Sequence, residues 1–292
     1  MQTGEMLFIQ TVLLPAAVGI IMFGLGLALV PADFVRVIRF PRAVLVGLLV
    51  QTFVLAAVAF GITLLFDLPP ALAVGLMLLA ASPGGALANI FSHLADGDVA
   101  LNITLTAVNS LLALAWVPLV LSWSLGYFFG PGHYVPPPVQ KILEVAAIVV
   151  LPVLLGMLAR HLSPPLALRA QAPVRALSVV LLAGVIAVAL VSGGAELLDH
   201  FAVVGLACLA FNLVSMAIGY LVPRALGLPS RQAISIAFEI GVHNSAIAIY
   251  IAMSALQNAA AAVPPSLYGL IQIATASLAV VTLRLWRSSV PA

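Results

Sequence analysis

Four polar side chains lie close together in an otherwise apolar stretch near the C-terminal end of the chain. The stretch IAFEIGVHNSAIAIYIA, residues 236–252, contains Glu239, His243, Asn244 and Ser245, with Gly241 between the acid and the histidine. A carboxylate among apolar residues is costly unless a cation, a proton or hydrogen bonds compensate for its charge. Glu239 could therefore bind a hard cation, carry a proton, or remain a neutral, hydrogen-bonded structural acid.

Oxygen-bearing side chains in other apolar stretches favour the cation. Gln51, Asn89, Asn102 and Thr106 would each need a polar partner inside lipid. Carboxylate, carbonyl and hydroxyl oxygens are the ligands that hard cations prefer. A single carboxylate among neutral oxygens suits a monovalent ion better than a divalent one.

Other kinds of chemistry fit these residues less well. Glu239 and His243 have the i, i+4 spacing that places two side chains on one helix face, but zinc takes three or four protein ligands. No other histidine or cysteine is placed to help, and the single cysteine, Cys208, lies in an apolar run. We find no aspartate pair, Ser-His dyad or zinc motif, so no enzyme is predicted. Asn109, Asn244 and Ser245 either line a path for an anionic substrate or join helices through hydrogen bonds.

The composition indicates the environment in which these residues lie. The chain of 292 residues is 64% hydrophobic and 7% charged, with a mean hydropathy of +1.25, whereas soluble domains carry about 25% charged residues. We therefore predict an all-α polytopic membrane protein. The net charge of +2 gives no reason to expect a nucleic-acid partner. Apolar runs of about 20 residues predict nine spans: 8–30, 43–66, 71–95, 98–127, 139–161, 173–194, 200–223, 230–256 and 263–287.

The arginines orient these spans. Nine crossings place ten arginines on one side of the membrane, and only Lys141, with Asp67, Glu196 and Asp199, on the other. The ten are Arg36, Arg39, Arg42, Arg160, Arg169, Arg175, Arg224, Arg231, Arg284 and Arg287. Basic loops stay in the cytoplasm, so the N-terminus should face outside and the C-terminus the cytoplasm.

Two of the predicted spans contain helix-breaking residues. The third has Pro83, Gly84 and Gly85 in its middle, and the eighth is interrupted at Gly241. Both follow a Leu-Pro pair by about four turns. Paired breaks in matching positions of two halves indicate the binding site of a transporter. Two kinked structural helices are the alternative, but a kink alone does not explain Glu239.

Three segments carry a resemblance to a known family. GIIMFGLGLALVPADF (19–34), SPGGALANIFSHLADGDVALNITLT (82–106) and FEIGVHNSAIAIYIA (238–252) resemble signature segments of the bile acid:sodium symporter family. The resemblance implies an inverted-repeat transporter with two broken, crossing helices. It also implies a core of helices at about 43–127 and 200–287, and a panel at about 8–30 and 139–194. This chain resembles the bacterial-type, nine-helix members that lack the first helix, which would place it in a bacterial inner membrane.

The resemblance also implies two sodium sites. At the first site Asn89, Thr106 and Glu239 match the family pattern, Asn102 replaces a serine, and Ala88 offers only its backbone. At the second site Gln51 and Glu239 match, with carbonyl groups from Ile240 and Val242, but His243 replaces a glutamine. Imidazole is a poor sodium ligand. The second ion is then absent or replaced by a proton on His243, which titrates near neutral pH, or His243 is a neutral core residue.

We therefore predict a secondary active symporter that works by alternating access. Sodium is the coupling ion, no other cofactor is expected, and the lipid bilayer is the surrounding partner. The substrate is an organic anion, either bile-acid-like or a small carboxylate such as pantoate or pyruvate. A proton-coupled transporter of the same fold that uses Glu239 and His243, or a passive channel, remains an alternative. A monomer is compatible with the sequence.

Overall fold

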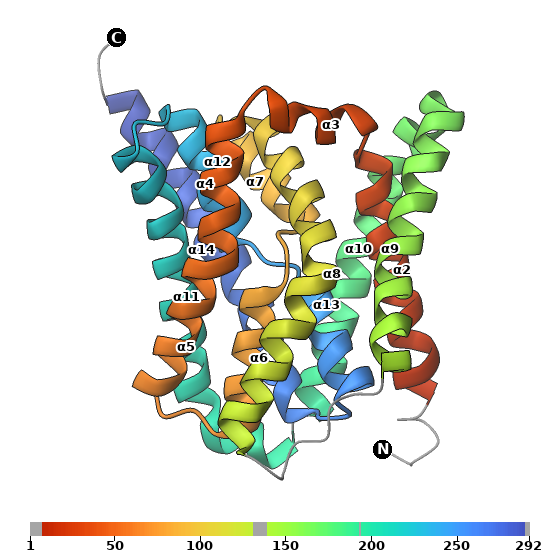
Figure 1. The fold of residues 1–292 in the computed structure, drawn as a ribbon, viewed down its shortest axis with the longest axis vertical. Coiled ribbons are helices and arrows are strands. Elements are labelled where there is room, and N and C mark those ends of the chain that lie inside the picture. The colour runs from red at the N-terminus through yellow and green to blue at the C-terminus, as the bar shows by residue number, and fades with distance from the viewer. Residues whose placement is uncertain (1–7, 131–138, 193, 290–292) are drawn as a thin grey trace.

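Long helices lie side by side across the molecule in the computed structural model (Figure 1), which describes residues 8–130, 139–192 and 194–289. The chain begins with the helices η1 (Ile9–Leu13), α2 (Leu14–Ala28), α3 (Pro31–Val35), η2 (Arg36–Ile38), α4 (Pro41–Leu49), η3 (Val50–Val54), α5 (Leu55–Leu65), α6 (Pro70–Ala81), α7 (Ala86–Leu94) and α8 (Val99–Phe129). It continues with α9 (Val139–Leu162), α10 (Pro164–Ser192), α11 (Gly194–Ala225), α12 (Ser230–Gly241), α13 (Ser245–Tyr250), η4 (Ile251–Ala255), η5 (Ala260–Ala262) and α14 (Val263–Ser289).

The all-helical membrane protein predicted from the composition is confirmed. Within the described ranges, six helical segments are long and apolar enough to cross a membrane: 11–28, 41–65, 99–129, 164–190, 200–225 and 260–285. In the most apolar 18 residues of each segment, at most 39% of the residues are buried inside the protein. Most residues of these stretches are therefore not buried inside the protein, as expected for helices that lipid surrounds.

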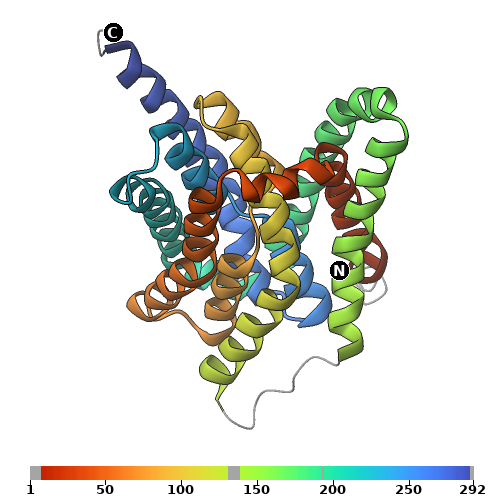
Figure 2. The ribbon, with the colours of Figure 1, turned by 45° about the horizontal axis from the view of Figure 1, so that its top comes forward.

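The helices form two groups. In the first, α2 packs against α9 and α10, and Figures 1 and 2 both show α2 and α9 side by side at one edge of the molecule. Gly26 of α2 faces the backbone of Val153, and Gly156 of α9 faces the carbonyl of Phe23 so closely that neither glycine could accept a Cβ atom. Small residues allow this close approach of helices in membranes. The second group contains α4 to α8 and α11 to α14, and α10 of the first group also packs against α11, α13 and α14.

Prolines and glycines set most helix boundaries. Pro31, Pro41, Pro70 and Pro164 occupy the first turn of their helices, where the missing N–H costs nothing. The predicted start of the sixth span at residue 173 is wrong. Helix α10 begins at Pro164 and contains Pro173 within the helix. Residues 31–38, which lie between the first two predicted spans, form two short helices.

Candidate functional site

The two predicted interruptions meet near the centre of the molecule. Helix α6 ends at Ala81 before α7 begins, and α12 ends at Gly241 before α13 begins. The connecting segments pair as antiparallel strands at Gly84 and His243, and their loops cross in Figure 1. The backbone N–H of Gly85 donates to the carbonyl of Val242 (3.2 Å), and that of Asn244 donates to the carbonyl of Pro83 (2.9 Å). These bonds satisfy backbone groups that would otherwise be unpaired at membrane depth.

Glu239 lies directly beside this crossing and is fully buried. Its Oε2 accepts a hydrogen bond from the Thr106 hydroxyl (2.6 Å), and its Oε1 accepts one from the Asn109 amide (3.1 Å). The backbone N–H of Gly84 is a third donor. None of these three partners carries a positive charge, and among the described residues no basic side chain forms an ion pair with this carboxylate.

The glycine at the crossing is needed because the carboxylate occupies the space of a side chain. A Cβ atom on Gly84 would lie 2.5 Å from the carboxyl carbon of Glu239 and 2.5 and 2.6 Å from its oxygens. The break in the first helix and the acid on the second therefore fit each other. We conclude that Pro83-Gly84-Gly85 interrupts the helix and also admits the acid.

The other residues of the predicted first sodium site make different contacts. The backbone carbonyl of Asn102 lies 3.1 Å from the Thr106 hydroxyl, whose single hydrogen is shared between this carbonyl and Glu239. The side-chain amide of Asn102 donates to the carbonyl of Ser235 (2.8 Å), and its Oδ1 is buried without a partner among the described residues. Ala88 is buried in a cluster with Phe238 and Val242 on either side of Glu239. Asn89 faces a cavity, and its Oδ1 is also buried without a partner.

The residues of the predicted second site meet at the carbonyl of Ser82. The Gln51 amide donates to it (3.1 Å), and Nδ1 of His243 lies 3.0 Å from it. A carbonyl only accepts, so Nδ1 of His243 carries a proton. Nε2 of His243 and Oε1 of Gln51 are buried without partners. The carbonyl of Val242 accepts the hydrogen bond from Gly85 at the crossing, and Ile240 is buried beside Gly219.

Two residues that the sequence analysis did not single out hold the end of α12. The hydroxyl of Tyr268 and the amide of Asn212 both donate to the carbonyl of Gly241 at 2.8 Å, and Asn212 also donates to Tyr268 (3.0 Å). Both side chains are fully buried. Asn212 could have been selected from the sequence, since it is another polar residue inside an apolar span. Tyr268 could not have been selected in this way, because tyrosine is common in membrane helices.

A cavity of about 430 Å³ lies between the two helix groups. Its first wall comes from α2, α9 and α10, and its polar residues are Arg160, Gln171, Arg175 and Ser178. Its second wall comes from α7, α8 and the crossing, and its polar residues are Asn89, His93, His243, Asn244 and Ser245. No aspartate or glutamate is among the lining residues. Asn244 and Ser245, predicted as substrate-lining residues, therefore line this cavity, whereas Asn109 contacts Glu239 instead.

Basic side chains gather at the end of the molecule where α3 lies. Arg42 donates to the carbonyl of Leu226, Arg231 to that of Asp96, and Arg284 to that of Leu94. The Arg42 bond ties α4 to the turn after α11, and the bonds of Arg231 and Arg284 tie α12 and α14 to the end of α7 and the turn that follows it.

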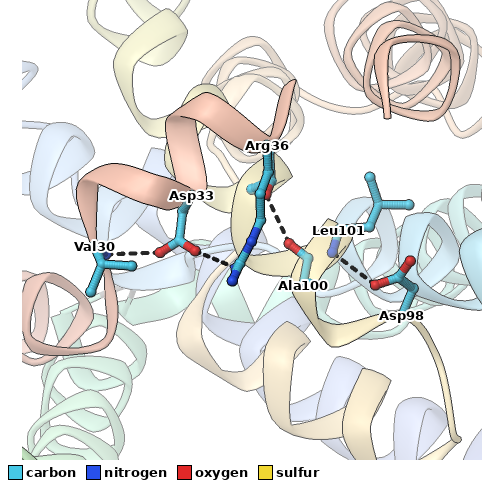
Figure 3. Close-up of polar contacts among 7 residues, drawn as sticks. Val30, Asp33, Arg36, Asp98, Ala100 and Leu101 are labelled. Atoms are coloured by element: carbon cyan, nitrogen blue, oxygen red, sulfur yellow. Dashed lines mark hydrogen bonds and ion pairs between the residues drawn. The ribbon is translucent and has the colours of Figure 1, made fainter. Parts of the chain in front are cut away.

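The connection from α2 to α4, which runs through α3, lies at the same end. Asp33 of α3 accepts from the Val30 backbone and pairs with Arg36, next to the start of α8 at Asp98 (Figure 3). Asp98 caps α8 by accepting from the backbone of Leu101. The side chains of Lys141, Glu196, Asp199 and Arg287 lie outside the described part of the protein.

Comparisons with known proteins agree on one family. A model of the Sodium Bile acid symporter family matches residues 15–201. The chain is 31% identical over 255 residues to the uncharacterized sodium-dependent transporter YocS of Bacillus subtilis, covering 86% of this chain and 76% of that protein. It is 27% identical to the probable sodium/metabolite cotransporter BASS1, chloroplastic, of Arabidopsis thaliana, covering 93% of this chain and 66% of that protein. It is 28% identical to the ileal sodium/bile acid cotransporter of Homo sapiens, covering 81% of this chain and 68% of that protein.

Proposed function

This chain belongs to the sodium bile acid symporter family, whose members are transporters rather than enzymes, and we propose that it couples sodium entry to the uptake of an organic anion. The buried Glu239 carboxylate at the crossing carries this proposal. It has three neutral hydrogen-bond donors but no counter-charge within the described part of the chain. A sodium ion would supply that charge in a place where an uncompensated carboxylate is costly.

Unpaired oxygen atoms on the predicted site residues support sodium as the ion. Oδ1 of Asn102, Oδ1 of Asn89 and Oε1 of Gln51 are buried without partners among the described residues. Such neutral oxygens, with one carboxylate, are what a hard monovalent cation requires. In this proposal Asn89, Asn102, Thr106 and Glu239 hold the ion, with the backbone of Ala88 beside them. Sodium then joins α7, α8 and α12.

The two helix groups would be the moving parts. We assign α2, α9 and α10 to a panel and the other long helices to a core. The six long spans, α9 and the pairs α6–α7 and α12–α13 would make nine crossings, with the two pairs as inverted repeats. Sodium and substrate bind at the crossing, and the core moves against the panel to change the side of access.

The charges assign the sides of this transporter. The arginine-rich end would face the cytoplasm, and the cavity that holds Arg160 and Arg175 would then be reached from inside. The membrane potential contributes about 2.3 kcal/mol per charge per 100 mV, which drives uptake when more positive than negative charge enters. The inner membrane of a bacterium is the proposed location.

Uptake by proteoliposomes tests this function. The purified protein is reconstituted, and accumulation of radiolabelled pantoate, pyruvate and taurocholate is measured with a sodium gradient, with a pH gradient, and with neither. Concentration of an anion that requires the sodium gradient supports the proposal. Equilibration without concentration would show a passive channel instead.

His243 offers a second candidate, which is coupling to protons. Its Nδ1 is committed to the carbonyl of Ser82, but its Nε2 is buried without a partner and its ring stacks on Phe211 (5.7 Å between centroids). A proton on Nε2 could take the place of a second cation. Concentrative uptake that follows the pH gradient and is lost in His243→Gln would establish this candidate, whereas His243→Gln should leave a sodium-driven transporter active.

A further inference from the structure

Two arginines from different helices converge on one short turn. Arg42, in the first turn of α4, donates to the carbonyl of Leu226, and Arg224, in the last turn of α11, donates to the carbonyl of Leu228 (2.8 Å). Leu226 and Leu228 are two residues apart in the turn between α11 and α12, so their Cα atoms are at most about 7 Å apart. The two guanidinium groups are therefore neighbours at the end of the molecule where α3 lies.

This pair of positive charges has no counter-charge in the described part of the chain. Both side chains are exposed, and neither forms an ion pair with a described residue. No acidic residue occurs in α4, in residues 200–225 of α11 or in the turn 226–229. Two like charges held close together repel each other, and each carbonyl partner uses only some of the five N–H groups of a guanidinium. An anion that contacts both arginines would offset the repulsion and accept from the remaining donors.

Exposed leucines continue from these two charges toward the middle of the same helices. Leu45 and Leu49 follow Arg42 on one face of α4, at i+3 and i+7, and are 57% and 46% exposed. Leu221 precedes Arg224 by one turn of α11 and is 61% exposed. Helices α4 and α11 pack against each other and lie side by side in Figure 1. A positively charged surface therefore adjoins an apolar one that is formed by the same two helices.

We propose that Arg42 and Arg224 bind the phosphate of an anionic phospholipid, whose acyl chains lie along the exposed leucines of α4 and α11. A free phosphate ion would use the charges alone, whereas a phospholipid also covers the apolar surface. In the proposed topology this end faces the cytoplasmic leaflet, where anionic headgroups attract basic side chains. Helix α4 precedes the first broken helix pair and α11 precedes the second. The lipid would thus hold the two halves of the core together, with or without sodium.

Lipid binding to the delipidated, purified protein in a neutral detergent tests this assignment. Native mass spectrometry counts bound lipid, and thermal unfolding measures stabilisation. The probes are a phosphatidylglycerol, the phosphatidylcholine with the same acyl chains, and glycerol 3-phosphate, which has the anionic group but no chains. At equal concentration, phosphatidylglycerol should bind and stabilise the protein, and the other two should not.

Substitution of the two arginines should weaken this binding in proportion to the charge removed. Arg42→Gln and Arg224→Gln should each raise the Kd for phosphatidylglycerol about fivefold, and the double variant about twentyfold or more, because each removes one charge that attracts the anionic headgroup. Arg42→Lys keeps the charge and should keep most of the affinity. Because the Gln variants also lose a hydrogen bond within the protein, the quantity compared is the change on adding lipid, which does not depend on their stability without lipid.

Arg169→Gln is the matched control, because Arg169 is also exposed and lies near the same end, but belongs to α10. Its lipid binding should be unchanged. The assignment is overturned if Arg169→Gln weakens binding as much as Arg42→Gln does, which would show a general effect of net charge. It is also overturned if phosphatidylcholine binds as tightly as phosphatidylglycerol, or if glycerol 3-phosphate stabilises the protein equally well. Unchanged binding in the double variant would contradict it most directly.

Discussion

At the scale of single residues, the central feature is an acid surrounded by neutral donors. Thr106, Asn109 and the Gly84 backbone hold the Glu239 carboxylate in one position. Hydrogen bonds to a charged group reduce its cost of burial but do not cancel the charge. In the proposed transporter, this arrangement would leave the acid free to bind a cation that enters and leaves.

Removal of the Thr106 hydroxyl should weaken this site selectively. Thr106→Val removes a 2.6 Å hydrogen bond to Glu239, and we expect sodium affinity to fall about tenfold, because a bond to a charged group is lost. Thr104→Val is the matched control: Thr104 lies on the same helix and bonds only to the carbonyl of Ala100, one turn earlier. Sodium titrations followed by thermal unfolding compare the two. Equal effects of the two variants would contradict a role for Thr106 at the site.

Gly84 should not tolerate even one methyl group. Gly84→Ala would place Cβ 2.5 Å from the Glu239 carboxyl carbon, so either the acid or the crossing must move. We expect a loss of about 1–3 kcal/mol in stability, as for other overpacked sites, together with weaker sodium binding. Gly61→Ala on α5 has no atom within 4 Å of the new Cβ and should be neutral. Unfolding temperatures of both variants give the comparison, and a neutral Gly84→Ala would show that the carboxylate is free to move.

Residue types predicted part of this site. Glu239, Thr106, Asn102 and Gln51 could be selected because polar groups in apolar spans need partners. The contact between Asn109 and Glu239 could not be predicted, since it depends on the rotation of α8 against α12. The same holds for His243, whose bond to Ser82 exists only because the two breaks pair.

At the scale of elements, the crossing depends on what holds the broken ends. The carbonyl of Gly241 lies at the end of α12 and accepts from both Tyr268 and Asn212. Proline and glycine patterns predicted where the helices break. They did not predict these supports, because Asn212 and Tyr268 come from two other helices, α11 and α14.

Loss of the Tyr268 hydroxyl should therefore destabilise the crossing. Tyr268→Phe removes the donor to Gly241 (2.8 Å) and the acceptor of Asn212 (3.0 Å), and we expect a loss of about 1–3 kcal/mol. Tyr220→Phe removes only a 3.4 Å contact to Ser230 in a partly buried position. Thermal unfolding should show a clear decrease for Tyr268→Phe alone. A decrease of the same size in Tyr220→Phe would mean that the effect is not specific to the crossing.

At the scale of the whole molecule, the arginines and the cavity share one end. The positive-inside pattern predicted a common side for the arginines. Arg42, Arg231 and Arg284, from α4, α12 and α14, bond there to the end of α7, the turn after it and the turn after α11. The cavity was beyond sequence reasoning, because it is formed by side chains from six helical segments and the crossing. If this end is cytoplasmic, the described conformation is open to the inside.

Site-directed labelling tests that orientation. In a Cys208→Ala background, Arg175→Cys places a thiol at the exposed side of the cavity, and Asp67→Cys places one in the turn between α5 and α6 at the other end. A membrane-impermeant maleimide should label the first only in inverted vesicles and the second only in intact cells. The reverse pattern would invert the proposed topology without changing the site.

The most direct measurement is a sodium titration of the purified protein and of its Glu239→Gln variant. The variant keeps the size and much of the hydrogen bonding of the acid but removes its charge. Sodium, compared with choline at equal ionic strength, should stabilise the parent protein by about 2.7 kcal/mol at a hundred times its Kd, and should not stabilise Glu239→Gln. Equal sodium stabilisation of both proteins, or none in the parent, would contradict the proposal that this carboxylate binds the coupling ion.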